Sequence, residues 1–261
     1  MEDSATYALQ QDGIQRVMLF GGHHICSGDP TGAIHELMCA DGKSPSGDIV
    51  RPYWSSHSAK LRVPRSGCRA AGIYDSQKAV RYIIIAGGVG INPVIPLPEC
   101  DLFDTVTLTI DPIASMQHPR TDHAMVEYNG SVVVICGWPG FTSCEQLDMT
   151  QCTWMPFPST NCSRAHCGAA VADNNIFLVG HVSELEVFDG YVWIIYHTSG
   201  IFSRLLVSSI VLGDRLILLG GTRDEIHAFN IKTRDTTTIR PTHVAFSRHG
   251  PIRSPYSAIA F

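Results

Sequence analysis

Five short segments of the chain share one hydrophobic pattern, a run of aliphatic residues that ends in glycine. A short apolar run bounded by a turn residue is typical of a buried β-strand. Five such runs at roughly regular spacing indicate a repeat architecture, in which each repeat is one structural unit. The runs cover residues 17–22, 83–88, 132–137, 176–180 and 216–221.

A second apolar strand precedes each of these runs and is joined to it by turn residues. In the third repeat the joint is Asn129-Gly130, and Asn-Gly between two apolar runs is the strongest short-range signal of a β-hairpin. His123 and His166 each lie 14 residues before a glycine, Gly137 and Gly180 respectively. We therefore interpret the two histidines as one repeated position of the hairpin, and His166 as part of the core.

A third strand follows each glycine and ends in an acid or an amide, and a tryptophan often follows in a fourth strand. Helical periodicity is nearly absent, so we expect no helix. Each repeat is therefore predicted to be four short strands joined by turns. The strand ends are Leu147-Asp148, Phe188-Asp189 and Phe229-Asn230, with Ile110-Asp111 and Ala40-Asp41 as looser matches, and the tryptophans are Trp54, Trp154 and Trp193.

An arginine opens most repeats, and the combined pattern resembles the kelch repeat of galactose oxidase-like proteins over residues 4–261. The third and fourth copies match well, and the other copies match in part. Tyr7 and Leu206 stand where the repeat has histidine, and Trp138 and His181 replace the second glycine of their pairs. The resemblance implies four-stranded blades of a β-propeller.

The sequence thus predicts an all-β chain with a single domain over residues 1–261, a β-propeller of about five four-stranded kelch-type blades. Residues 253–261 repeat the opening strand of a blade as a partial sixth copy. This strand either closes the ring by supplying the inner strand of the first blade, or begins a further blade of a larger propeller or chain. We favour closure with five blades.

Composition and charge exclude several classes of partner. A net charge of −5 at pH 7 lacks the basic footprint of nucleic-acid binding, and no run approaches the ~20 apolar residues of a membrane helix. The acidic segment 1–4 lacks the features of a signal peptide, so nine cysteines indicate reduced thiols in the cytoplasm, with the nucleus as the alternative. A Cys144–Cys152 disulfide across a hairpin is the less favoured alternative.

Loop topology predicts a working face. Loops alternate between the two faces of a meander, so second-to-third-strand loops share a face with blade-to-blade loops. Two long insertions, residues 22–33 and 88–101, belong to this class, and recognition usually lies on such loops. The predicted partner-binding residues on this face are Arg65, Arg120, Arg164, Arg204, Arg253, His23, His24 and Asn92.

The blade-opening arginines admit two interpretations. Guanidinium groups bind carboxylates bidentately, and the resemblance to kelch substrate adaptors implies that basic residues at such a rim hold acidic peptides. Alternatively, the arginines satisfy backbone carbonyls and pair with nearby acids inside the scaffold. We give the scaffold alternative more weight for each single arginine, because a residue that recurs in every repeat is more often structural.

Catalytic motifs are not assembled in the sequence. It has no phosphate-binding loop, dinucleotide fingerprint or nucleophile elbow, and His23-His24-x-Cys26 lacks a second pair of metal ligands. We therefore expect no catalytic residue, metal or cofactor, and predict a protein–protein interaction module, a scaffold or substrate-recognition propeller that binds a protein or an acidic peptide. The alternative is a kelch-fold enzyme of the carbohydrate oxidase or sugar mutarotase type. The sequence leaves the oligomeric state open.

Overall fold

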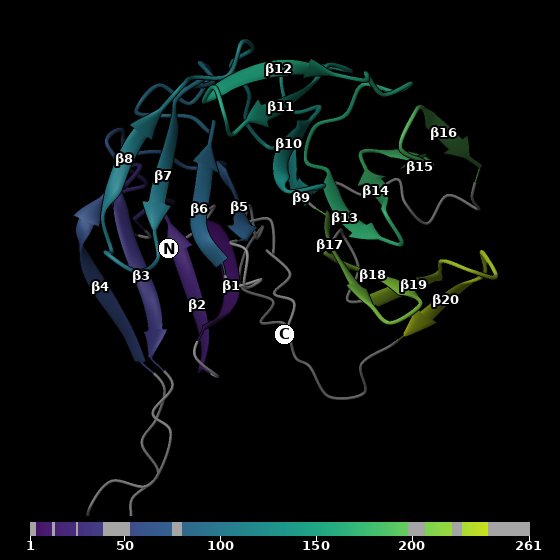
Figure 1. Ribbon diagram of the computed structural model, residues 1–261, viewed down its shortest axis with the longest axis horizontal. Helices are drawn as coiled ribbons and strands as arrows, with labels where there is room; N and C mark the ends of the chain where they lie inside the picture. Colours follow the sequence, from purple (N-terminus) through teal and green to yellow (C-terminus); the bar gives the residue numbers. More distant parts are fainter. Residues whose placement is uncertain are drawn as a thin grey trace, which may run out of the picture.

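The computed structural model describes residues 4–11, 14–24, 26–38, 53–74, 80–197, 207–220 and 226–239. Within these ranges the chain is all-β and forms five antiparallel sheets of four strands each. The sheets are the blades of a propeller, arranged along an arc with the first strand of each blade innermost and the fourth outermost (Figure 1). The prediction of an all-β propeller with five four-stranded blades is confirmed. The described ranges contain no helix long and apolar enough to cross a bilayer.

The strands follow the chain in order, four to a blade. Blade 1 contains β1 (Ala5–Gln11), β2 (Ile14–Phe20), β3 (Ala33–Met38) and β4 (Tyr53–Lys60). Blade 2 contains β5 (Arg69–Tyr74), β6 (Val80–Ala86), β7 (Cys100–Asp104) and β8 (Ile110–Ile113). Blade 3 contains β9 (Ala124–Tyr128), β10 (Ser131–Ile135), β11 (Cys144–Asp148) and β12 (Thr153–Phe157). Blade 4 contains β13 (Gly168–Ala172), β14 (Asn175–Gly180), β15 (Val182–Phe188) and β16 (Trp193–Tyr196). Blade 5 contains β17 (Val207–Leu212), β18 (Arg215–Gly220), β19 (Ile226–Asn230) and β20 (Thr236–Ile239).

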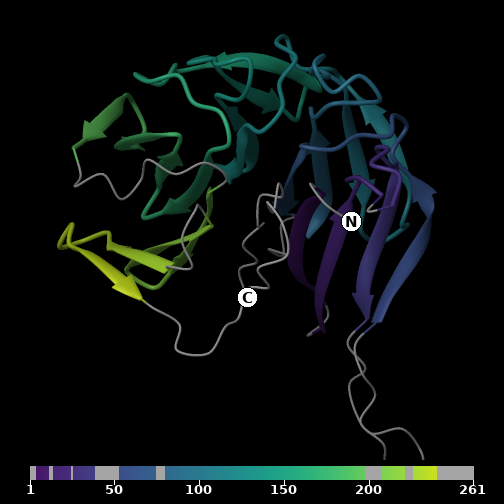
Figure 2. The same ribbon diagram turned by 180° about the vertical axis from the view of Figure 1, so that it is seen from behind.

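The inner strands pack against one another in sequence order, β1 on β5, β5 on β9, β9 on β13 and β13 on β17. Blades 1 and 5 border the open side of the arc, as both views show (Figures 1 and 2). Residues 253–261, the partial sixth copy, lie outside the described residues, so closure of the ring stays a prediction.

A pair of left-handed residues ends the second strand of blades 1 to 4 and turns the chain. In blade 2 the pair is Gly87 and Gly88, with φ of 64° and 100°. A Cβ atom on Gly87 would clash with the carbonyl oxygen of Arg120, and one on Gly88 with that of Ser66. Glycine is required here because the opening segments of blade 3 and of blade 2 itself approach the pair too closely for a side chain.

The pair in blade 3 is one residue earlier than the sequence pattern suggests. Cys136 and Gly137 have φ of 58° and 104°, so cysteine replaces the first glycine and the prediction that Trp138 replaces the second is wrong. In blade 4 the pair is Gly180 and His181, with φ of 100° and 68°, as predicted.

In blades 2 to 5, the acid or amide at the end of the third strand closes the turn to the fourth strand. Its side-chain oxygen accepts hydrogen bonds from the backbone N–H groups two and three residues ahead, at 2.8–3.0 Å. This Asx-turn geometry stabilises a tight turn. The residues are Asp104, Asp148, Asp189 and Asn230. Each of these turns also contains one left-handed residue, namely Leu108, Cys152, Gly190 or Arg234. In blade 2, Asp104 takes the role predicted for Asp111, which lies within β8, and Asp41 lies outside the described residues.

The fourth-strand tryptophans of blades 3 and 4 connect each of these blades to the preceding one. Trp154 donates its indole N–H to the carbonyl of Ala114 at 2.9 Å, and Trp193 donates to Pro158 at 2.8 Å. Both rings are buried in clusters that join two blades. Trp54 is 47% exposed, and its blade borders the open side of the arc.

The eight cysteines in the described ranges are free thiols. Cys144 is buried at the start of β11, whereas Cys152 is exposed in the turn at the far end of the same hairpin. The Cys144–Cys152 disulfide is therefore wrong.

Candidate functional site

Three of the predicted partner-binding arginines are completely buried. Arg65, Arg120 and Arg164 are each 0% exposed. Each pairs with an acid on the third strand of its own blade and donates to the backbone carbonyl at the end of the second strand. The ion pairs are Arg65–Asp101 at 2.5 Å, Arg120–Glu145 at 2.7 Å and Arg164–Glu186 at 3.1 Å, and the carbonyl acceptors are those of Gly87, Cys136 and Gly180.

These contacts correct the predicted site and support the scaffold interpretation. A buried guanidinium that is paired with a carboxylate and bonded to carbonyls has no free donor to offer a partner. Arg65, Arg120 and Arg164 are therefore part of the scaffold and not of a partner-binding surface. Arg204 and Arg253 lie outside the described residues. The preference for an acidic peptide rested on these arginines and loses its basis.

The two long insertions meet on one face of the propeller. Ser66, at the opening of blade 2, forms an isolated β-bridge with Val89 of the second insertion. The hydroxyl of Ser66 also lies 3.0 Å from Nε2 of His23 in the first insertion. We call this side the loop face. It carries the β2–β3, β6–β7 and β10–β11 loops and the opening segments of the blades.

An exposed aliphatic turn projects from the loop face. Ile91, Val94 and Ile95 are 88%, 67% and 56% exposed. Asn92 holds the turn, because its Oδ1 accepts a hydrogen bond from the backbone N–H of Val94 at 3.2 Å. At the base of the loop, Leu97 N–H donates to Gly88 at 2.8 Å. We call residues 91–95 the apolar turn. The aliphatic side chains of the apolar turn are exposed to solvent, and hydrogen bonds fix the backbone that carries them.

The neighbouring residues of the loop face add further exposed groups. Trp138, in the β10–β11 loop, is 41% exposed. His24 and Cys26 are exposed in the first insertion, whereas His23 is half-buried. Within the described ranges no group of three or more His, Cys, Asp or Glu residues is placed to hold a metal ion. The partner-binding roles of His23, His24 and Asn92 stay predictions.

A polar cluster lies at the tops of the inner strands. The residue two positions after each buried arginine is left-handed: Gly67, Asp122 and His166 have φ of 63°, 52° and 51°. Asp122 Oδ2 lies 3.5 Å from Nδ1 of His166, and Asp122 Oδ1 lies 4.0 Å from Arg69. Non-glycine residues in this conformation are strained and gather at functional sites.

The charge state of the cluster follows from its contacts. Burial acts to raise the pKa of Asp122, but the interaction with His166 and the charge of Arg69 outweigh it, so the pKa lies below its usual value. Asp122 is therefore ionised at neutral pH. Nδ1 of His166 lies 3.5 Å from this carboxylate, beyond the reach of a well-formed hydrogen bond, and the His166 side chain is 33% exposed. The interpretation of His166 as core is wrong.

His123 and His166 are not equivalent. His166 lies two residues after Arg164, whereas His123 lies three residues after Arg120 and is 0% exposed. Neither ring nitrogen of His123 has a hydrogen-bond partner. The equal spacing of His123 from Gly137 and of His166 from Gly180 is misleading by one residue. Gly180 corresponds to Cys136, because each is the first residue of its left-handed pair. Alignment on the arginines would have brought Asp122 and His166 together.

Comparisons with known proteins identify the fold and no family. No protein-family model matches the chain, and no curated protein matches it. Among solved structures, the chain is similar to one titled "Structure of YjhT", with a TM-score of 0.68 and 13% sequence identity. The match covers 91% of this chain and 83% of that chain. At this identity the likeness supports the propeller fold alone.

Proposed function

We propose that the chain is a kelch-type propeller that binds a protein or peptide partner on its loop face. The observation that carries the proposal is the apolar turn, in which Ile91, Val94 and Ile95 stand exposed side by side. Contiguous exposed aliphatic groups on a soluble domain mark interaction sites. Rigid blades that present recognition loops suit this role.

The chemistry of the loop face indicates what the partner offers. Complete burial of one valine or isoleucine side chain contributes roughly 1.5–3 kcal/mol, so the apolar turn favours a partner with an apolar surface. His166 and Asp122 lie within the same face and can exchange hydrogen bonds with a polar group beside it. Such a pairing of apolar contact with a few polar groups is typical of specific interfaces.

The repeated scaffold contacts support the kelch-type assignment. The left-handed pair, the Asx turn and the fourth-strand tryptophan are the features on which the resemblance rests, and each has a defined structural role. We also propose a cytoplasmic location, on the basis of the free thiols of the described ranges and the redox conditions that preserve them.

A matched pair of variants tests the proposal. Ile91→Asp combined with Val94→Asp places charges on the apolar turn. Val106→Asp is the control, because Val106 is 60% exposed in the β7–β8 turn on the opposite face. We expect tagged wild type and Val106→Asp to retain a common partner from lysate, and the double variant to lose it.

The recovered partner is then purified and titrated against the three proteins, with circular dichroism to establish that each is folded. Loss of affinity confined to the double variant supports the loop face. Equal affinity for all three proteins would reject the apolar turn as the binding surface.

A further inference from the structure

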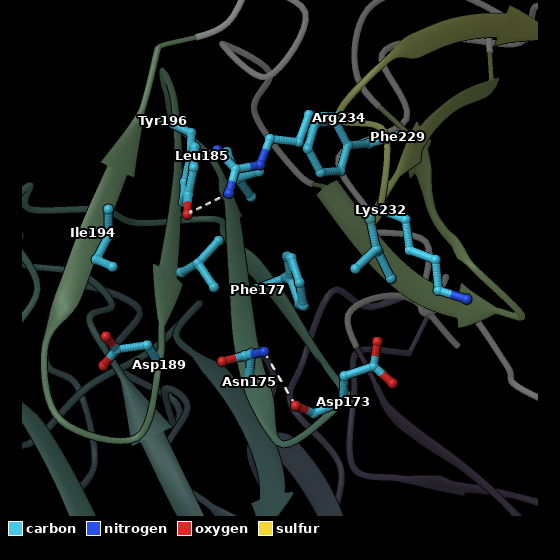
Figure 3. A pocket seen from close by; sticks show the side chains of 12 residues that line it. Asp173, Asn175, Phe177, Leu185, Asp189, Ile194, Tyr196, Phe229, Lys232 and Arg234 are labelled. Carbon is cyan, nitrogen blue, oxygen red and sulfur yellow. Dashed lines mark hydrogen bonds between the residues drawn. The ribbon is translucent and has the colours of Figure 1, made fainter.

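A cavity of about 240 Å³ lies between blades 4 and 5. Its walls are mainly apolar and come from both blades, as Figure 3 shows. Phe177, Leu185 and Tyr196 contribute from blade 4, and Phe229 and Arg234 from blade 5. We call it the interblade cavity. It opens among the β13–β14, β15–β16 and β19–β20 turns, on the face opposite the loop face.

The cavity corresponds to a missing tryptophan. At the two preceding interfaces an indole fills the space between blades, and the residue opposite it on the third strand faces the same way. Directly paired residues of an antiparallel sheet lie on one face. In blade 5 the paired residues are Phe229, which lines the cavity, and Thr236. The equivalent pairs are Leu147–Trp154 in blade 3 and Phe188–Trp193 in blade 4. Threonine thus stands where an indole would fill the space.

The charges at the two ends of the cavity differ. Arg234 lies over the ring of Tyr196, 4.6 Å from its centroid, and its Nη2 lies 3.4 Å from the phenol oxygen. Among the described residues no carboxylate lies within ion-pair distance of Arg234. Asp173 and Asp189 lie toward the other end (Figure 3). The second cation in the lining, Lys232, is paired with Asp214 at 2.9 Å. A ligand with one anionic group would therefore direct it to Arg234.

We propose that the interblade cavity binds a small aromatic acid of the indole carboxylate class. The bicyclic ring takes the space that Trp154 and Trp193 fill elsewhere, between Phe177 and Phe229, and the carboxylate pairs with Arg234. An apolar cavity of about 150 Å³ is enough to bind benzene, so a larger cavity accommodates a bicyclic ring. A second ring gains edge-to-face contacts with the two phenylalanines.

Isothermal titration calorimetry of the full chain with indole-3-acetate tests the proposal. We expect saturable binding to wild type and none to Thr236→Trp, in which the new side chain fills the cavity. Thr237→Trp is the matched control, because Thr237 is exposed on the opposite side of β20 and its variant keeps binding. Binding that persists in Thr236→Trp, or no saturation of wild type, overturns the proposal.

A second variant tests the role of the cation without filling the cavity. Arg234→Gln should weaken indole-3-acetate about fivefold, the effect of a partly exposed ion pair, and leave neutral indole unchanged. This arm also covers the case in which Thr236→Trp does not fold. An equal effect on indole and on indole-3-acetate would show that Arg234 does not bind the carboxylate.

Discussion

Each of the three buried arginines joins its own blade to the preceding one. The guanidinium of Arg120 pairs with Glu145 inside blade 3, and its backbone carbonyl accepts a hydrogen bond from Gly88 of blade 2 at 2.9 Å. Removal of this side chain would leave the buried carboxylate of Glu145 without its guanidinium partner, at a cost of roughly 3–5 kcal/mol. The arginine recurs because the assembly of adjacent blades depends on it.

One buried histidine makes folding depend on pH. Burial, together with the charges of Arg69 and Arg120, holds the pKa of His123 well below 6.5. The folded protein keeps this imidazole neutral, whereas the unfolded chain binds a proton on it below about pH 6.5. The free energy of unfolding therefore falls as the pH falls below that value.

We predict that His123→Cys removes this dependence, which amounts to at most about 1.4 kcal/mol per pH unit. The substitution introduces the residue found at the equivalent positions Cys68 and Cys167, both buried. Urea unfolding at pH 7.5 and 5.5 measures the difference. The exposed His24 provides the control, since His24→Gln should keep the wild-type difference. The same loss of stability in His123→Cys and wild type would refute the prediction.

The sequence shows which residues recur in the repeats, but it does not show whether their side chains are buried or exposed. The recurrence of arginine before each hairpin is visible along the chain. The acids that pair with these arginines, such as Asp101 and Glu145, lie 25 to 36 residues further along the chain. No local pattern in the sequence connects an acid to its arginine. Asp122 and His166 were missed as a pair for the same reason, because they come from different blades.

Among the strand elements, the fourth strand adds to the blade-to-blade contacts that the inner strands make. Its tryptophan packs on the preceding blade and donates to the connecting segment, as Trp154 does to Ala114. Loss of such a buried donor leaves a carbonyl without its partner, which costs about 1–3 kcal/mol. In blades 3 and 4, one tryptophan side chain thus strengthens the contact with the preceding blade.

We predict that Trp154→Phe lowers the free energy of unfolding by about 1–3 kcal/mol. Trp54→Phe is the matched control. Trp54 has the same strand register, opposite Leu37, but is half exposed, so its replacement should change stability by less than about 0.5 kcal/mol. Chemical denaturation of both variants measures the effect. An equal cost at the two positions would show that the tryptophan does not act through the blade interface.

The strand pattern was predictable because its signals are local. Asn129-Gly130 marks a hairpin, and the turns at Asp148 and Asp189 use side chains next to the strand they end. The prediction for blade 2 was wrong because both Phe103-Asp104 and Ile110-Asp111 fit an apolar residue followed by an acid. Only strand pairing, which places Phe103 opposite Ile110, decides between them.

At the scale of the whole molecule, the two faces of the propeller differ. The loop face presents the apolar turn and the Asp122–His166 pair, whereas the opposite face presents the Asx turns of blades 2 to 5 and the interblade cavity. Alternation of loops in a four-stranded meander predicts which loops share a face, and the contacts of Ser66 with both insertions agree with it. Which loop residues are exposed depends on packing, so the aliphatic residues of the apolar turn were found only in the structure.

Site-specific photocrosslinking tests the central claim, that a partner binds the loop face, most directly. A photoreactive p-benzoylphenylalanine replaces Val94 in one protein and Val106 in another, two valines of similar exposure on opposite faces. With the purified partner, irradiation should give a covalent complex from position 94 and none from position 106. Crosslinking from position 106, or equal crosslinking from both positions, would contradict the account.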